Sequence, residues 1–385
     1  DLLYTTRFVM KIRCPKLNLL KALEIVSPAL PTTTTIPELT HVCLNATDRG
    51  LTISATNMRT FISTQIECET QTPGEVLVQG KFFHELVHSL SNSSDSIAQI
   101  EVDPMNNRVQ LTVVGDHSCK NDIPGRQKDD YPEVELIDAD CEFQITGKEF
   151  RELLRIGGIC SSLTENSLQG FRGTCLDFKD GQLHVASTDG NRLMKATRSL
   201  SINSSESLRW MISQEVCSEL SKILPTDEVS VRQQGNKFLV EFDTTIFQSL
   251  LAQAEFLDYE EYIPEEVSEG ISLDRTLFLE YLKGVNPVAR ENGNRVVFEL
   301  KENAMGVRAF SEVMGEAYRE LEIENKLSDM TVAFNSKYIM DYLNSISDSK
   351  VFMLCEGEGM PAYFWGEDNS QECSHICVIM SLSLH

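Results

Sequence analysis

Six stretches of the chain repeat the spacing of an amphipathic helix at nearly equal intervals, and this repeat constrains the fold more than any other feature. In each stretch apolar residues recur at three- and four-residue steps, as at Phe150, Leu153 and Leu154. The stretches cover residues 16–27, 80–91, 146–158, 213–224, 274–285 and 335–347, so that consecutive starts lie 61 to 67 residues apart. We therefore expect a protein built from six related parts.

Between the helices the apolar period falls to two, which is typical of half-buried strands. Turn signals such as Asp180-Gly181 separate these runs. Each part is thus one helix followed by about four strands, and Ser213, Asp274 and Asn335 are suitable helix N-caps. The first, third and fifth parts share a late strand pair, in the segments SATNMRTFI, ASTDGNRLMKA and RAFSEVMGEAYRE.

One helix on a small antiparallel sheet cannot close a core, so two parts are expected to form one domain. The predicted fold class is α+β, with three similar domains that each pack two helices on antiparallel sheets. The predicted boundaries are 10–138, 139–267 and 268–385. Residues 1–9 are interpreted as an extension or expression remnant, with Met10 as the native start. A coincidental spacing in a large α+β enzyme is the alternative.

The charge is distributed unevenly between helices and loops. The chain carries 34 Lys and Arg against 58 Asp and Glu, a net charge of −24, which argues against a protein that coats nucleic acid with its whole surface. The helical stretches, with the third and fifth extended to residues 163 and 289, sum to +1. If all helices face one way, that face suits an approach to phosphates. Ordinary solvated helices would show the same composition.

Eleven cysteines scattered from Cys14 to Cys377 do not resemble the framework of a small secreted protein. No stretch has the length of an apolar membrane span, and the first residues lack the apolar core of a signal peptide. We expect a soluble protein of the reducing cytoplasm.

Two patterns could bind metal. His84-Glu85-Leu86-Val87-His88 matches the zinc-peptidase pattern literally, but no glycine-histidine extension follows. Cys373, His375 and Cys377 alternate on one strand face, where core packing explains the spacing better than ligation, since no fourth ligand is evident. A zinc metallopeptidase, and an acidic DNA mimic that forms no ring, are the alternative functions.

Several segments, in order, resemble the bacterial DNA sliding clamp family, the beta subunit of DNA polymerase III. They are MKI at 10–12, TTIPEL at 34–39, KFFHEL at 81–86, STDGNRL at 187–193, FLDY at 256–259, FNSKYIMDYL at 334–343 and VIMSLSL at 378–384. The resemblance runs from Met10 to Leu384. It rests on the order and spacing of these segments, since no single one is decisive.

The resemblance implies a non-catalytic processivity factor. Two chains would close head to tail into a homodimeric ring around double-stranded DNA, without sequence preference. The implied partners are the polymerase III catalytic subunit, the clamp loader and other proteins with clamp-binding peptides. No cofactor, metal or membrane is implied.

The resemblance also implies three sets of residues. An apolar peptide pocket would comprise Phe171, Thr188, Gly190, Arg192, Leu193, Leu257, Tyr262, Asn335, Tyr338, Met360, Val378, Met380 and Leu382. The cations that face DNA would be Lys21, Lys81, Lys148, Arg151, Arg155, Lys222, Lys283 and Lys337. The dimer interface would place Ser118 and Lys120 opposite Pro287 and Val288.

This sequence departs from the family pattern at several of these places. Asn191 replaces a histidine, Leu257 a proline and Glu261 a common arginine, while Ser381 and Ser383 replace the terminal proline and arginine. The pocket is expected to persist with a different preferred peptide. In the predicted interface, polar side chains at 118 and 120 replace the apolar residues that commonly seal the ring.

Overall fold

The structure is a computed structural model of the 385-residue chain. It describes residues 10–90, 95–114, 119–128, 131–132, 134–138, 143–162, 164, 167–200, 208–264, 267, 270–323, 328–367 and 373–384. The chain divides into two compact units, residues 1–144 with 218–250, and residues 145–217 with 251–385. Two elements cross this division, β11 (Phe143–Thr146) and α4 (Gln214–Ile223).

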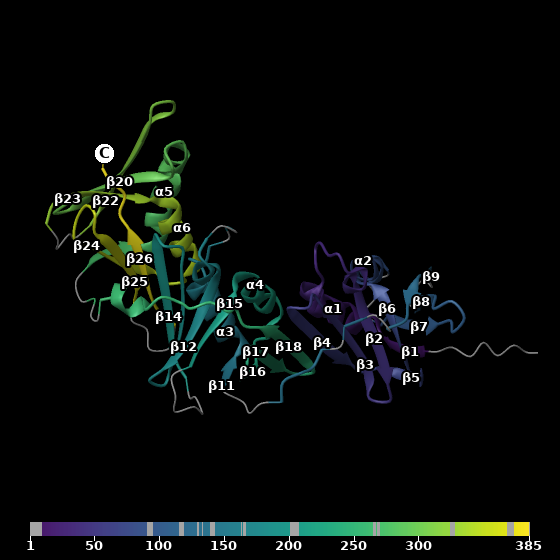
Figure 1. Cartoon of the computed structure of the whole chain (residues 1–385). Helices are drawn as coiled ribbons and strands as arrows, with labels where there is room; N and C mark the ends of the chain where they lie inside the picture. Colours follow the sequence, from purple (N-terminus) through teal and green to yellow (C-terminus); the bar gives the residue numbers. More distant parts are fainter. Residues whose placement is uncertain are drawn as a thin grey trace, which may run out of the picture. The chain divides into compact units, whose positions relative to one another are not determined.

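The first unit packs two helices, α1 and α2, against two antiparallel sheets. Strands β5-β1-β7-β8-β9 form one sheet, and β10-β6-β2-β3-β4-β18-β17-β16 follow one another in the second. Helix α1 packs on β3 and β4, and α2 on β2 and β6 (Figure 1). The bounds are β1 (Met10–Pro15), α1 (Lys16–Val26), β2 (His41–Thr47), β3 (Gly50–Thr56), β4 (Thr60–Ile66), β5 (Glu69–Thr72), β6 (Gly74–Gln79), α2 (Gly80–Ser89), β7 (Ile97–Val102), β8 (Val109–Val114), β9 (Cys119–Ile123), β10 (Gly125–Arg126), β16 (Glu228–Gln234), β17 (Lys237–Phe242) and β18 (Thr245–Leu250).

The second unit repeats this design with α3, α5 and α6. Its sheets have the strand orders β15-β12-β13-β14-β26-β25-β24-β19 and β22-β21-β20-β23. The bounds are α3 (Gly147–Gly157), β12 (Gly173–Lys179), β13 (Gln182–Thr188), β14 (Arg192–Ser199), β15 (Leu208–Ser213), β19 (Ile271–Asp274), α5 (Arg275–Arg290), β20 (Arg295–Lys301), β21 (Ala304–Ser311), β22 (Gly315–Glu322), β23 (Met330–Asn335), α6 (Ser336–Ser345), β24 (Lys350–Cys355), β25 (Pro361–Gly366) and β26 (Ser374–Met380).

All six predicted helices are present, each directly after a strand. The predicted caps are confirmed: the side chains of Ser213, Asp274 and Asn335 accept backbone N–H bonds from the first turns of α4, α5 and α6. Helix α3 has a full capping box, in which Thr146 and Glu149 each bond the other's backbone N–H. Helix α5 extends beyond the predicted end and contains Pro287.

The predicted apolar faces form the core of each unit. On α3, for example, Phe150, Leu153, Leu154 and Ile156 are all buried. Each such side chain stabilises the fold by roughly 1.5–3 kcal/mol relative to an exposed one. The α+β class of the prediction is confirmed, with helices on antiparallel sheets.

The three-domain division remains a prediction, because strands from adjacent predicted domains pair with each other. Strand β4 pairs with β18 through the couple Thr60↔Ser249, and β14 pairs with β26 through Leu193↔Val378. The sheets therefore continue from one predicted domain into the next. No helix of the described residues has the length and apolar character needed to cross a membrane.

Candidate functional site

The turn between β13 and β14 forms the frame of the candidate site. The hydroxyl of Thr188 donates to the carbonyl of Arg192 (2.7 Å) and accepts from the N–H of Gly190 (3.1 Å). One carboxylate oxygen of Asp189 accepts from the N–H groups of Asn191 (3.0 Å) and Arg192 (3.1 Å). These bonds satisfy the turn internally, as an Asp-Gly turn predicts.

Glycine suits position 190 of this turn for two reasons. Its φ of 90° lies in the left-handed region, which residues other than glycine rarely adopt. A Cβ at this position would also come within 3.1 Å of the Phe171 ring. Glycine therefore lets the turn and the aromatic ring approach each other.

Arg192 joins the turn to helix α6. Its guanidinium donates to Asp189 (3.0 Å) and Asp341 (2.9 Å) and lies over the Tyr338 ring, 4.3 Å from the centroid. Burial by itself disfavours the charge, yet the surrounding acidic groups, Asp341 and Asp189 among them, raise the pKa of Arg192 above its ordinary value. Burial, together with Asp189, raises the pKa of Tyr338. The arginine is thus a fixed cation that orients both elements.

A cavity of about 250 Å³ opens beside this turn, and we name it the Leu193 cleft. Its lining residues are Phe171, Thr188, Gly190, Asn191, Arg192, Leu193, Leu257, Tyr262, Val378 and Met380. Leu193 and Val378 belong to a buried apolar cluster with Met211, Phe256 and Tyr259. The floor is therefore rigid and apolar, while the rim is polar, a combination that suits an apolar anchor on an extended chain.

All but four of the predicted pocket residues line this cleft. Asn335 instead caps α6, and Tyr338 stacks under Arg192. Met360 is 45% exposed, and Leu382 forms an isolated bridge with Ala333. Asn191 lines the cleft but was not among the predicted residues. Its position in the same turn is the signal that could have identified it.

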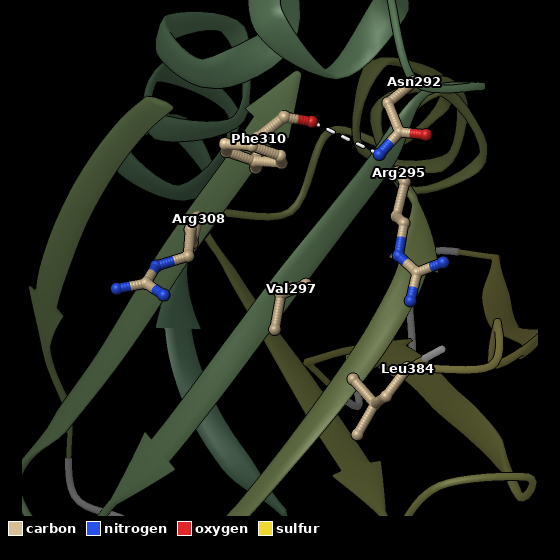
Figure 2. Close-up of a pocket in the computed structure, with 6 residues that line it drawn as sticks. All are labelled: Asn292, Arg295, Val297, Arg308, Phe310 and Leu384. Carbon is tan, nitrogen blue, oxygen red and sulfur yellow. Dashed lines mark hydrogen bonds between the residues drawn. The ribbon is translucent and has the colours of Figure 1, made fainter. Parts of the chain in front are cut away.

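The C-terminal tail borders this cleft and a second cavity. The N–H of Met380 donates to the Asn191 carbonyl (2.9 Å), and the N–H of Leu382 donates to the Ala333 carbonyl (2.7 Å). Beyond them, Arg295 donates to the Ser383 carbonyl. Figure 2 shows the second cavity, of about 260 Å³, on the face of β20 and β21. It is lined by Asn292, Arg295, Val297, Arg308, Phe310 and Leu384. Hydrogen bonds therefore fix the tail to the turn on one side and to β23 and Arg295 on the other.

Comparison with known proteins decides the family. A model of the N-terminal domain of the DNA polymerase III beta subunit matches residues 10–135, and a model of its C-terminal domain matches residues 260–380. The chain belongs to the DNA polymerase III beta subunit family. The resemblance in the sequence is thereby confirmed, and the chain is a sliding clamp, a non-catalytic processivity factor.

Individual relatives are distant but align over nearly the whole chain. The beta sliding clamp of Rickettsia felis is 22% identical, over 98% of this chain and all of the relative. That of Bacillus subtilis is 24% identical, over 91% and 94%. The crystal structure of the Pseudomonas aeruginosa beta subunit superimposes with a TM-score of 0.88 at 21% identity, covering 97% of this chain and all of that one.

In this clamp chain, the predicted DNA-facing cations lie on the helices and mostly point into solvent. Arg151 is half-buried, and the other seven are exposed. Lys337 forms an ion pair with Asp341 (2.7 Å) one turn away. The helix cation Lys16, which was not in the predicted set, is instead buried, and its ammonium donates to the Leu90 carbonyl (2.9 Å).

The described residues of the predicted interface lie on an end strand and on a helix surface. Lys120 is exposed on β9, the end strand of its sheet, while Ser118 lies outside the described residues. Pro287 is exposed and Val288 half-buried on α5. Strand β22 ends the second unit's smaller sheet, and the apolar Val313 and Met314 are exposed in the turn that precedes it.

The alternative metal sites gain no support. Within the described ranges, no group of three or more His, Cys, Asp or Glu side chains could hold a metal ion. The rings of His84 and His88 lie 6.3 Å apart. Cys373, His375 and Cys377 are buried, and the His375 ring contacts Asp348 (3.0 Å) and the Tyr342 hydroxyl (3.3 Å), so this strand face packs into the core.

Proposed function

We propose that two copies of this clamp close head to tail around duplex DNA and carry partners on short linear peptides that bind in the Leu193 cleft. The partners would be the catalytic subunit of polymerase III, the clamp loader and other proteins with clamp-binding peptides. The proposal places the protein in the cytoplasm, with the DNA on which its family acts.

The Leu193 cleft is the observation that carries the proposal for peptides. Its floor is apolar and buried, so a leucine or phenylalanine anchor would lose contact with water when it enters. Its rim offers the Asn191 side chain, which is exposed, for polar contact. The walls of the cleft are already held in place by the turn, the Arg192 ion pairs and the tail. A peptide would therefore bind with little loss of conformational entropy in the protein.

The helices support the proposal for DNA. Exposed lysines and arginines gather on them in a chain of net charge −24, so duplex phosphates would be attracted to the helices and repelled by the acidic loops. Such contacts carry no base information, and they allow the ring to slide.

Open sheet edges support the ring. Among the described strands, β9 and β22 each end a sheet and have no further strand on their outer side. Pairing between copies at such edges would satisfy the outer backbone groups of these strands in a closed, symmetric assembly.

Retention on circular DNA tests this function. Protein loaded on a closed circle by its clamp loader should remain bound and should leave rapidly once a restriction enzyme cuts the circle. Native mass spectrometry of the same sample should show two chains per particle. Retention on cut DNA, or a monomer of 43.3 kDa at micromolar concentration, would contradict the proposal.

A further inference from the structure

The first unit contains a second turn that repeats the turn of the Leu193 cleft bond for bond. There the Thr56 hydroxyl donates to the Thr60 carbonyl (2.9 Å) and accepts from the N–H of Met58 (3.1 Å). One side-chain oxygen of Asn57 accepts from the N–H groups of Arg59 (3.0 Å) and Thr60 (2.7 Å). Met58 has a φ of 72°, which lies in the left-handed region, as the φ of Gly190 does.

The elements around the two turns correspond as well. The N–H of Leu250, at the end of β18, donates to the Arg59 carbonyl (3.1 Å), as Met380 at the end of β26 donates to Asn191. The Thr60 hydroxyl donates to Glu219 of α4 (2.8 Å), as Arg192 donates to Asp341 of α6. Both carboxylates are the sixth residue of their helix. The two turns are therefore copies within the internal repeat.

A cavity of about 290 Å³ opens beside this second turn, and we name it the Phe61 cleft. Its lining residues are Thr56, Met58, Arg59, Thr60, Phe61, Pro132, Val134, Glu135, Lys237, Gln248, Ser249 and Leu250. It lies where the Leu193 cleft lies relative to its own turn, since Phe61 corresponds to Leu193 and Leu250 to Met380.

The lining indicates a different occupant. Met58, Phe61, Pro132, Val134 and Leu250 are exposed or half-buried, so an apolar side chain of a ligand could cover them. Two cations stand beside them. Arg59 is exposed, and the Lys237 ammonium bonds a backbone carbonyl, that of Glu135 (3.1 Å). Among the described residues of the lining, Glu135 is the one acid. The Glu219 carboxylate of α4 accepts from Thr60 and Asn57.

We propose that the Phe61 cleft is a second docking site, which binds an extended peptide with an apolar anchor flanked by acidic side chains. The apolar anchor would pack on Phe61 and Leu250, and the acidic side chains would pair with Arg59 and Lys237. The inference rests on the proposed function of the Leu193 cleft, because the correspondence of the turns extends peptide binding from one cleft to the other.

Two fluorescein-labelled peptides, titrated separately by anisotropy, test the inference. The acidic probe is a short synthetic peptide with a leucine-phenylalanine pair between aspartates. The second probe carries glutamine, leucine and phenylalanine anchors. Each is titrated against wild type, Phe61→Asp, Lys237→Glu and the matched control Leu193→Asp. Thermal unfolding of every variant verifies its fold.

The acidic probe should lose roughly a hundredfold in affinity with Phe61→Asp, roughly tenfold with Lys237→Glu and none with Leu193→Asp. A photoreactive version of the probe should cross-link to residues that line the Phe61 cleft. Lys237→Glu, at a half-buried surface position, keeps the test decisive if Phe61→Asp does not fold.

Three results would overturn the inference: no saturable binding of the acidic probe to wild type, equal affinity for wild type and Lys237→Glu, or a loss with Leu193→Asp alone. The second probe reports on the proposed function independently. If it binds none of the proteins while the acidic probe behaves as expected, the peptide role of the Leu193 cleft fails and the Phe61 cleft stands.

Discussion

The Leu193 cleft and the Phe61 cleft have the same backbone frame and different side chains. In both, a threonine hydroxyl and an Asx side chain close the turn, and a neighbouring strand donates one N–H to it. At the position after the turn, however, Arg192 forms one ion pair with Asp189 of the turn and a second with Asp341 of α6, whereas Thr60 reaches α4 with one hydroxyl. The comparison teaches that the repeat preserves the geometry of a cleft, while a few side chains decide what it can bind.

The sharpest way to break the comparison is Leu193→Asp. This change puts a carboxylate on the apolar floor, where a peptide anchor would leave it without water or a partner. We expect roughly a hundredfold weaker binding of the peptide with glutamine, leucine and phenylalanine anchors, measured by fluorescence anisotropy.

The matched control is Phe61→Asp, which alters the corresponding position of the other cleft and should leave this peptide's affinity unchanged. Equal affinity of folded Leu193→Asp and wild type would mean that the peptide binds elsewhere.

The two links from turn to helix should differ in strength. Arg192→Ala removes a largely buried cation from Asp189 and Asp341, and we expect a loss of about 2 kcal/mol in the free energy of unfolding. Thr60→Val removes one hydrogen bond to Glu219 and should cost about 1 kcal/mol. Thermal and urea unfolding of both variants measure the difference. If Thr60→Val proves the more damaging, the assigned strengths are wrong.

The C-terminal tail is a further difference between the clefts. It contributes Met380 to the lining of the Leu193 cleft, and none of its residues is among the described lining of the Phe61 cleft. Deletion of residues 382–385 removes the Leu382 bridge and the bond from Arg295 to Ser383, but it keeps Met380. We expect roughly tenfold weaker binding of the same peptide, because the wall loosens while its lining residues remain. Binding of the acidic probe to the Phe61 cleft and the native mass of the dimer should not change. If the deletion weakened binding of the acidic probe or dissociated the dimer, the tail would also support the Phe61 cleft or the dimer interface.

A pH effect from one strand position should appear in the second unit and not at the matching position of the first. Burial lowers the pKa of His184 on β13 to about 4, helped by the charge of Lys195. The corresponding residue of β3, four positions before its turn, is Thr52. Because the unfolded chain binds a proton to this histidine near pH 6.5 and the folded chain does not, stability should fall as the pH drops from about 6.5 towards 4.

His184→Gln should remove this part of the decline, about 1 kcal/mol after allowance for solvent screening of a partly buried group. Thermal unfolding between about pH 7 and pH 5 compares the variant with wild type and with His88→Gln, which alters an exposed histidine on α2. Identical pH profiles for His184→Gln and wild type would contradict the assignment.

Local patterns predicted much of this structure. The helices appear where the 3.6-residue period placed them, and the N-caps at Ser213, Asp274 and Asn335 are correct, because both depend on residues within one or two turns. The motif at His84 shows the limit of such reading. Two histidines one turn apart match a zinc pattern, but among the described side chains no third ligand comes near.

The sequence by itself determined the repeat and the helices, because periodicity and capping depend on neighbouring residues, and its resemblance to the clamp family implied most of the residues around the Leu193 cleft. Only the tertiary structure decided that Arg192 pairs with Asp341, 149 positions away, and that Asn191 joins the lining while Leu382 does not. It also decided that the turn at Thr56 has its own cleft, since Leu250 and Lys237 reach that turn through strand pairing. Pairing between distant strands depends on which edges meet after folding, and no local pattern encodes that choice.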